Sequence, residues 1–468
     1  MQATAPRTAP APLPDGSART KMLLIVGGGG VLLFGLAILL VLICFSGNTP
    51  APAPPDNSDD GPIVVQTGPK KKPPPPPLVS LPPEEQKKVD AAVAKAAEFL
   101  KSRQLPNGTW GGFPLGMTSI TGLTLLEAGL KPSDPPIQKA VAFVRGSAPN
   151  WNSGQETYEL SLAVLFLDRL GDPQDKELIQ KMILRLVAAQ TPQGGWAYRC
   201  PQLSQDEYTQ LYTALKELQH RTPEEVSRGQ AGHVNLSPRV RNLAVLRPDN
   251  GNPKQVFRGG GDNSNTQFAI LAMLVARKYD VPLERCLSLI VKRFRNSQNA
   301  DGRWTYNGQI EVTPLPTMTC AGLLGLAVGF GLEEKDKHVG RPEDDPAVKK
   351  ALEHLSKFVG QPGGNEAQVP MHVRQMYFLW SVERVAVLYQ LKTINEKKWY
   401  HWGVEILMAH QRPDGAWKGG GHGSTDVLDT CFAILFLQRT NLAKDLTDKL
   451  EELRAARPAA GSSPARKD

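Results

Sequence analysis

Hydrophobic residues recur at helical spacing between about residues 85 and 443. In residues 160–167 the apolar side chains fall at positions i, i+3, i+4 and i+7, which share one face of an α-helix. The same spacing recurs in residues 268–275 and 382–389. Further helical patterns cover residues 89–100, 178–189, 283–295 and 402–409. Strand-like alternation is nearly absent, so this part of the chain is predicted to be all-α.

One short motif occurs four times with identical spacing: a Gln, three residues, a Gly, one residue and a Trp. Each copy follows one helical pattern and precedes another, so the motif is predicted to be a turn between paired helices, with the Gly supplying the turn conformation. We expect the Gln to cap a helix end and the Trp to pack on the neighbouring repeat, a structural role. The copies are Gln104, Gly108 and Trp110; Gln190, Gly194 and Trp196; Gln298, Gly302 and Trp304; and Gln411, Gly415 and Trp417.

Two degenerate copies complete the repeat pattern. Residues 140–145 with Trp151 lead into a helical pattern over 158–170, and residues 348–359 lead into another over 371–391. The chain is therefore predicted to form six helix pairs over residues 85–443, with an insertion at 200–261 that contains a helix over 206–218. Six pairs that close on themselves give an α/α toroid (an α6/α6 barrel), and an open solenoid is the alternative.

The front of the chain has the pattern of a membrane anchor. Residues 22–45 are predominantly apolar and contain no charged residue, which is long enough to span a bilayer as one helix. Basic residues precede this stretch in the 1–21 tail, and acidic residues follow it first. The charge asymmetry predicts a cytoplasmic N-terminus and an extracytoplasmic main domain, as in a single-pass membrane protein.

Two segments are predicted to be disordered. Residues 46–84 are rich in Pro, which favours an extended polyproline II spacer between the membrane and the helical domain. Residues 444–468 end in a stretch rich in Ala, Pro, Ser and Lys and are expected to form a disordered C-terminal tail.

Composition excludes some functions. The chain has 468 residues and a formal net charge of +8, without a Lys/Arg stripe interleaved with aromatic residues. A dedicated nucleic-acid binder is therefore not expected. The five cysteines are widely spaced and contain no C-x-x-C pair, which argues against a disulfide framework and a zinc finger.

The four Gln–Gly–Trp motifs resemble the QW repeats of squalene–hopene and oxidosqualene cyclases and of the related protein prenyltransferase β subunits. The resemblance covers roughly residues 85–443 and is closest over residues 402–437. It implies the α/α toroid with a central cavity, and an isoprenoid or other lipid-like molecule as the ligand. It is specific for the superfamily and much less so for any one activity.

The catalytic motifs of that superfamily are incomplete in this chain. The D-x-D-D motif, which supplies the acid of the cyclases, is absent. Zinc prenyltransferases hold their metal with an Asp-x-Cys pair and a His, and Asp429, Cys431 and His422 are the matching candidates. A buried thiol without a metal is the other interpretation, because residues 265–268 repeat the frame of 429–432 with Gln in place of Cys. We expect no cofactor, with zinc as the alternative.

Other residues are candidates for the lining of a central cavity: Asp262, Asn265, His372, Arg374, Tyr377, Trp380 and Asp429. The first two follow a Gly-rich stretch, where they either receive an anionic headgroup or only cap a helix. The residues between 372 and 380 belong to one predicted inner helix. Arg and aromatic side chains there suit a lipid-like or carbohydrate ligand, and a Trp/Tyr core stripe is the alternative.

The sequence therefore favours a membrane-tethered, extracytoplasmic toroid that binds a hydrophobic ligand or a protein partner without cyclase chemistry. The first alternative is an atypical terpene cyclase or prenyltransferase with a metal site at Asp429 and Cys431. The second is a structural scaffold. No catalytic residue is assigned, and no protein partner is identified by its chemistry.

Overall fold

The computed structural model describes residues 78–219, 235–247, 260–307, 315–332, 341–360, 376–420 and 423–455. Within these ranges the regular elements are helices, and the β pairing is limited to two isolated bridges. The predicted all-α class is confirmed. The membrane-spanning segment predicted at 22–45 and most of the linker lie outside the described residues. None of the helices in the described ranges is both long and apolar enough to cross a membrane.

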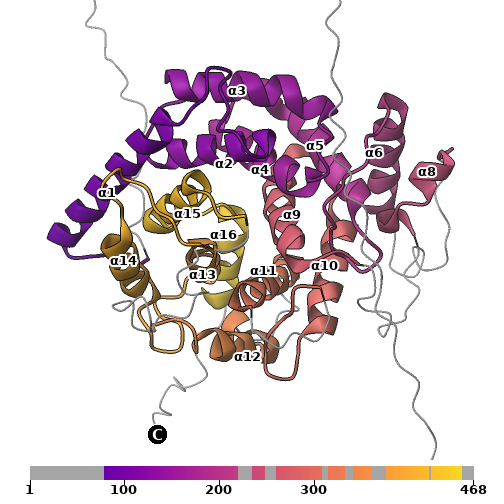
Figure 1. Cartoon of the computed structure of the whole chain (residues 1–468). Coiled ribbons are helices and arrows are strands. Elements are labelled where there is room, and N and C mark those ends of the chain that lie inside the picture. The colour runs from indigo at the N-terminus through magenta and orange to yellow at the C-terminus, as the bar shows by residue number, and fades with distance from the viewer. Residues whose placement is uncertain are drawn as a thin grey trace, which may run out of the picture. The chain divides into compact units, whose positions relative to one another are not determined.

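Six helices pack against one another in a cycle, which we call the inner ring. They are α2 (Pro114–Glu127), α4 (Glu156–Leu170), α9 (Asn263–Ala276), α11 (Pro316–Leu332), α13 (Met376–Leu388) and α15 (Asp426–Gln438). Each packs on the next, and α15 packs on α2 (Figure 1). Nearly every residue of these helices is buried, because ring neighbours and a second layer of helices cover them on all sides.

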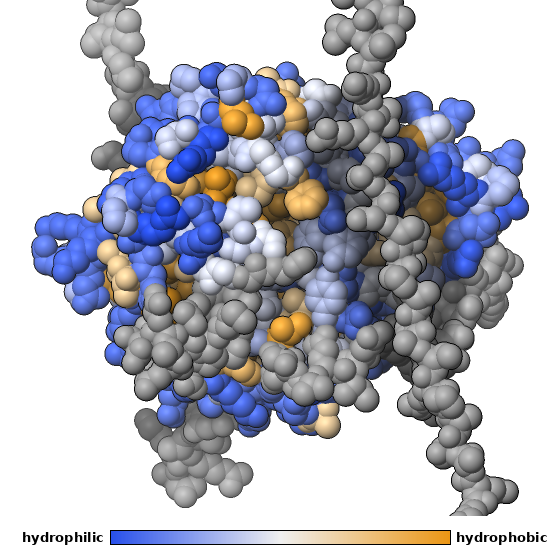
Figure 2. All heavy atoms as spheres, viewed as in Figure 1, coloured by the Kyte–Doolittle hydropathy of each residue, from blue (hydrophilic) through white to orange (hydrophobic). Residues whose placement is uncertain are grey.

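A second layer of helices surrounds the inner ring. It contains α1 (Pro83–Ser102), α3 (Pro135–Ser147), α5 (Lys176–Ala189), α10 (Glu284–Ser297), α12 (Pro346–Leu355) and α14 (Trp399–His410). Each packs on one or two inner helices with an apolar stripe and leaves its charged face to solvent. Figure 2 accordingly shows mostly hydrophilic residues around the periphery of this layer.

Shorter elements connect the two layers. The 3-10 turns are η1 (Ala148–Asn150), η2 (Pro173–Asp175), η3 (Ala244–Leu246), η4 (Arg277–Tyr279) and η5 (Pro342–Asp344). The inserted segment between α5 and α9 contributes α6 (Gln205–Gln219) and α8 (Pro238–Arg241). The helix predicted at 206–218 is thereby confirmed as α6.

The Gln side chains of the four Gln–Gly–Trp turns have the same hydrogen bonds. Each Gln donates its amide N–H groups to the carbonyl of the turn Gly and to a carbonyl of the next outer helix. The second acceptor lies at 2.8–3.0 Å and belongs to Pro136 for Gln104, Cys286 for Gln190, Ala347 for Gln298 and Ala92 for Gln411. The repeat therefore joins successive outer helices through one amide per turn.

The turn glycines have the conformation that the motif predicts. All four have a φ between +74° and +91°, and a Cβ atom on any of them would lie 2.0–2.7 Å from a carbonyl oxygen of the next outer helix. The glycine and the residue of that carbonyl are Gly108 with Lys139, Gly194 with Leu289, Gly302 with Lys350 and Gly415 with Lys95.

The turn tryptophans are buried, with 6% or less of each residue exposed. Each indole N–H donates to the carbonyl ten residues earlier, at 2.6–3.1 Å. The pairs are Trp110 with Leu100, Trp196 with Leu186, Trp304 with Phe294 and Trp417 with Leu407. The Trp304 ring also packs on α11, the helix that follows its own turn and not a helix of the neighbouring repeat: a Cβ atom at Gly322 would lie 2.1 Å from the ring.

These contacts refine the roles expected for the Gln and Trp side chains. Gln190, Gln298 and Gln411 occupy the C-cap positions of α5, α10 and α14, as predicted, whereas Gln104 lies one residue beyond Arg103, the C-cap of α1. The polar bond that reaches the neighbouring outer helix comes from the Gln, and the Trp indole bonds to its own outer helix.

The fourth turn connects the end of the repeat to its beginning. Gln411 donates to the Ala92 carbonyl of α1 at 2.8 Å, across 319 positions of sequence. Gly415 has a φ of +91°, and a Cβ atom there would lie 2.7 Å from the Lys95 carbonyl oxygen. Only Gly permits both the backbone conformation and this close approach. The same contacts that join successive outer helices therefore join the last one to the first.

The expected disordered tail from residue 444 is wrong for its first part. Residues Lys444–Ala455 form α16, which packs on α11 and α13. Leu446, Leu450 and Leu453 are buried, since their spacing places them on one helical face. Arg454 also forms an ion pair with Glu343 at 2.7 Å. The remainder of the predicted tail lies outside the described residues.

Candidate functional site

The N-terminal turns of several inner helices meet at one end of the inner ring, which we call the ring mouth. Glu159 of α4 accepts a hydrogen bond from the backbone N–H of Gly116 in α2 at 3.3 Å. The Tyr158 hydroxyl of α4 donates to Ser264 Oγ of α9 at 2.8 Å, and Ser264 Oγ is 2.9 Å from the Tyr377 hydroxyl of α13. These helices therefore point the positive ends of their dipoles toward the mouth, where electron-rich or anionic groups are stabilised.

A line of hydrogen bonds leads from the ring mouth into the interior of the ring. Tyr158 and Tyr377 are partly exposed, whereas Ser264 and Gln267 are buried. The Gln267 amide nitrogen donates to the Tyr377 hydroxyl. Its amide oxygen accepts from Arg384 Nη2 of α13 at 2.8 Å. Burial raises the pKa of Tyr377 to about 12, so its hydroxyl stays neutral and takes part in this line as donor and acceptor.

Arg384 lies at the inner end of this line. Its side chain is 6% exposed, and its guanidinium carbon is 3.8 Å from the centroid of the Trp380 ring. Nη2 donates to Gln267 and to Ser381, while Nε and Nη1 have no hydrogen-bond partner. Burial lowers the pKa of Arg384, but a guanidinium keeps its charge in proteins. A buried cation with two unused donors is costly unless an acceptor approaches it.

Aromatic rings from four inner helices form a cluster that contacts this cation through Trp380 and Phe268. Phe268 of α9 is 5.7 Å from Trp380 and 5.1 Å from Tyr158, measured between ring centroids. Phe432 of α15 is 4.9 Å from Trp380 and 5.5 Å from Tyr377. We call Tyr158, Phe268, Tyr377, Trp380 and Phe432 the aromatic cluster. It offers apolar surface next to the Arg384 charge.

Two large side chains near the mouth are exposed. Phe113, the N-cap residue of α2, is 56% exposed, and Tyr198 is 40% exposed. Tyr198 belongs to the mouth because its carbonyl accepts from the Thr157 N–H of α4 at 2.9 Å. Its hydroxyl is also 2.9 Å from that of Tyr306. The Tyr198 ring is 6.0 Å from that of Tyr158, so Tyr198 extends the aromatic cluster toward solvent.

Glu383, next to Arg384 on α13, is fully buried and has a different environment. Both of its carboxyl oxygens lack a hydrogen-bond partner. Burial raises the pKa of Glu383 well above its ordinary value, which favours the neutral form of the acid. Its nearest charged influences besides Arg384 are Glu127 and Arg439, which lie at the ends of α2 and α15 away from the mouth.

The structure places the sequence candidates in two groups. Tyr377 and Trp380 join the aromatic cluster. Asp262 and Asn265 bond to each other: Asp262 Oδ1 accepts from the Asn265 N–H at 2.7 Å, and Oδ2 accepts from Asn265 Nδ2 at 2.8 Å. This is the N-cap arrangement of α9 that the sequence offered as an alternative to headgroup binding. His372 and Arg374 lie outside the described residues.

Of the three zinc candidates, the structure describes Asp429 and Cys431, and these two side chains bond to different partners. Asp429 accepts from the Gly419 N–H at 3.0 Å and from Ser424 Oγ. Cys431 instead donates to Thr121 of α2, and burial raises the pKa of its thiol to about 12. His422 lies outside the described residues. Within the described ranges, no group of three His, Cys, Asp or Glu side chains is placed to hold a metal ion.

The repeated frame around these residues has a structural role. The Thr430 hydroxyl accepts from the backbone N–H of Trp417 at 3.1 Å, and the Thr266 hydroxyl accepts from the backbone N–H of Trp196 at 3.0 Å. The two helices α9 and α15 therefore start in the same way. Cys431 occupies the position that Gln267 has in α9, and we derive no step through a metal at this position.

Sequence reasoning missed Tyr158, Ser264, Gln267 and Arg384. One signal could have found Arg384: Glu383 and Arg384 are the only charged residues in the apolar segment Met376–Leu388. Charged residues inside a helix that is otherwise apolar on all sides point to an interior polar site. No local signal connects Arg384 with Gln267, which lies 117 positions earlier.

Comparisons with known proteins assign no family to this chain. No protein-family model matches it, and no curated protein matches it. One similar solved structure is that of a protein from Actinoplanes, which is 13% identical and aligns over 76% of this chain and 99% of that chain. Its TM-score of 0.31 is too low to support an argument about fold or function.

Proposed function

We propose that residues 78–455 form an α/α toroid of the squalene cyclase and prenyltransferase type, which binds an elongated apolar ligand with an anionic head inside the inner ring. The cyclic packing of six inner helices inside a second helical layer supports the fold. The four identical turns, with the contact of the fourth on α1, support closure of the ring.

The observation that carries the ligand proposal is the state of Arg384. Its guanidinium is buried against Trp380, and two of its nitrogens have no acceptor. An anionic headgroup would supply that acceptor and would be favoured further by the N-terminal helix ends at the mouth. Between the ring mouth and Arg384, neutral hydrogen-bonding groups are available to the headgroup: the hydroxyls of Tyr158 and Tyr377 and the amide of Gln267.

The apolar part of the ligand is assigned to the aromatic cluster and to the exposed Phe113 and Tyr198. Contiguous aromatic surface next to a few convergent polar groups is typical of sites for amphipathic ligands. An isoprenyl or related lipid chain with a phosphate or carboxylate head fits this combination. The predicted membrane span at 22–45 and the Pro-rich linker would hold the ring beside a bilayer, where such ligands are found.

The proposal assigns binding and no reaction. The D-x-D-D acid is absent from the sequence. Asp429 and Cys431 are engaged with separate partners. Retention or transfer of an amphipathic lipid is the function that needs the fewest further assumptions.

Binding of farnesyl phosphate and of farnesol to the detergent-solubilised full chain tests the proposal. Farnesyl phosphate should bind, and Arg384→Met should weaken it by about tenfold or more, because the charged contact is lost. Farnesol should bind more weakly and should respond little to the same substitution. Arg103→Met, at the exposed end of α1, is the matched control.

A folding defect is separated from a binding defect by Arg384→Lys, which keeps the charge, and by circular dichroism of every variant. Equal affinity of the wild type and folded Arg384→Met for farnesyl phosphate would show that the ring does not bind an anionic head through this residue.

A further inference from the structure

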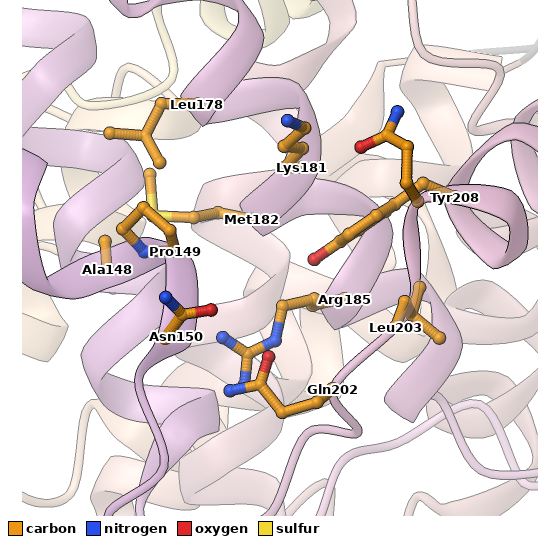
Figure 3. A pocket seen from close by; sticks show the side chains of 11 residues that line it. Ala148, Pro149, Asn150, Leu178, Lys181, Met182, Arg185, Gln202, Leu203 and Tyr208 are labelled. Carbon is orange, nitrogen blue, oxygen red and sulfur yellow. The ribbon is translucent and has the colours of Figure 1, made fainter.

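A second candidate site lies on the outside of the inner ring, where the inserted helix α6 approaches α5. A cleft of about 190 Å³ opens there between η1, α5 and the start of α6 (Figure 3). All of its lining residues belong to the described ranges. The cleft owes one wall to the insertion, so the repeat architecture alone does not create it.

The buried wall of the cleft carries Arg185 of α5, whose side chain is 1% exposed. Nε donates to the Pro201 carbonyl at 3.1 Å and Nη2 to the Trp151 carbonyl at 2.8 Å, while Nη1 has no partner. Both acceptors are neutral. Figure 3 shows the guanidinium between the side chains of Asn150 and Gln202. Its hydrogen bonds go to neutral carbonyls, and the buried Glu156 attracts it only through space, so the cleft holds a buried positive charge without a bonded counter-ion among the described residues.

A second cation stands at the rim of the cleft. Lys181 lies one helical turn before Arg185, so both side chains are on the same face of α5. Lys181 pairs at 2.7 Å with Glu177, which is highly exposed and does not line the cleft. Such an exposed pair contributes little and is easily exchanged for another anion. No Asp or Glu lines the cleft, so its polar half attracts negative charge.

The other half of the lining is apolar. Leu178 and Met182 of α5 face Leu203 of the inserted segment across the cleft, beside Ala148 and Pro149 of η1 (Figure 3). Inorganic anions gain nothing from such a surface, whereas an organic anion buries its hydrocarbon part there. Nη1 is the nitrogen of Arg185 that lacks a partner, so it is the donor available to a carboxylate oxygen, and a hydrogen bond between two charged groups is stronger than one between neutral groups.

We propose that this cleft binds a small organic carboxylate, with the carboxylate toward Arg185 and Lys181 and the apolar body against Leu178, Met182 and Leu203. This site is independent of the ring mouth and of the ligand proposed there. It gives the inserted segment a function, because Leu203 and Tyr208 complete a pocket that α5 alone leaves open.

Benzoate and benzamide, which differ mainly in charge, are the probes for the detergent-solubilised full chain in isothermal titration calorimetry. Benzoate should bind, and benzamide should bind at least about tenfold more weakly, because it lacks the charge. Inorganic phosphate should also bind more weakly than benzoate, because it lacks the apolar body.

Three substitutions locate the site. Lys181→Glu should abolish benzoate binding, and Lys181→Met should weaken it several-fold; both lie at the rim, where the fold tolerates change. Arg185→Met should abolish binding as well, with circular dichroism as the check on its folding. Lys216→Met on α6, away from the cleft, is the matched control and should bind as the wild type does, as should Arg384→Met.

Three results would overturn the proposal: equal affinities for benzoate and benzamide, unchanged benzoate affinity in Lys181→Glu, or phosphate binding as tight as that of benzoate. The last would make the cleft a general anion site rather than a carboxylate site. Because Arg384 takes no part, failure of the ring-mouth proposal leaves each of these outcomes interpretable.

Discussion

Closure of the ring can be tested at Gly415. A methyl group added by Gly415→Ala would lie 2.7 Å from the Lys95 carbonyl oxygen and 3.0 Å from its carbon, both in α1. The φ of +91° adds the cost of a left-handed conformation, about 1–2 kcal/mol for a residue with a side chain. Displacing packed backbone costs about 1–3 kcal/mol more. The free energy of unfolding should therefore fall by about 2–5 kcal/mol.

Two other glycines separate these contributions. Gly420 has a φ of +77° with nothing within 4 Å of the position that a Cβ would take, so Gly420→Ala should cost only about 1–2 kcal/mol. Gly108, where a Cβ would lie 2.6 Å from the Lys139 carbonyl oxygen, makes the equivalent contact between sequence-adjacent helix pairs. Gly108→Ala should thus match Gly415→Ala.

Urea unfolding of the detergent-solubilised chain, followed by circular dichroism at the helix band, measures all three values. In an open arrangement of helix pairs, Gly415 would not contact α1. The two segments lie 319 positions apart in the sequence, so only closure of the ring brings them together. In the open arrangement Gly415→Ala would cost no more than Gly420→Ala, while Gly108→Ala would remain severe. That result would refute ring closure.

Further predictions concern buried groups. Because the pKa of Glu383 is raised in the folded state, the free energy of unfolding is highest below the ordinary pKa of a Glu and falls as the pH rises above it. Glu383→Gln should therefore raise the free energy of unfolding by about 1–3 kcal/mol at pH 8 and change it little at pH 4. Equal effects at both pH values would contradict burial of the acid. Because burial raises the pKa of Cys431 to about 12, iodoacetamide at pH 8 should leave it unmodified in the folded chain and label it in urea, as peptide mass spectrometry would show; rapid labelling of the native protein would contradict the assignment as a buried thiol. Leu450→Ala should lower the free energy of unfolding by about 2–5 kcal/mol if α16 is packed as observed, with the partly exposed Lys449→Ala as the control and calorimetric melting as the measurement.

Much of the helical architecture could be predicted from local pattern. The turn bonds are short in sequence: each Gln reaches the Gly four residues later, and each Trp reaches the carbonyl ten residues earlier. Spacing alone therefore identifies the turns and the helices on either side. The helix at 444–455 was missed because the Pro- and Ser-rich end of the chain dominated the composition of that segment, although the spacing of Leu446, Leu450 and Leu453 indicated an apolar face.

The candidate site was predictable only in part. Tyr377 and Trp380 stood out as aromatic residues on a predicted inner helix. The inner helices are apolar all round, so periodicity does not distinguish the face toward the ring interior from the face toward the outer layer. Arg384 and Gln267 could not be paired for that reason, and Asp262 and Asn265 were equally consistent with a ligand site and with the helix cap they form.

By itself, the sequence determined the all-α class, the order of the helix pairs and the position of each Gln–Gly–Trp turn, because these depend on interactions within about ten residues. Tertiary structure alone decided which outer helix each Gln reaches, that the fourth turn packs on α1, and that Arg384 lies against Trp380 beside Gln267. The physical reason is that these contacts join segments distant in the chain, whose meeting depends on how all the helices pack together.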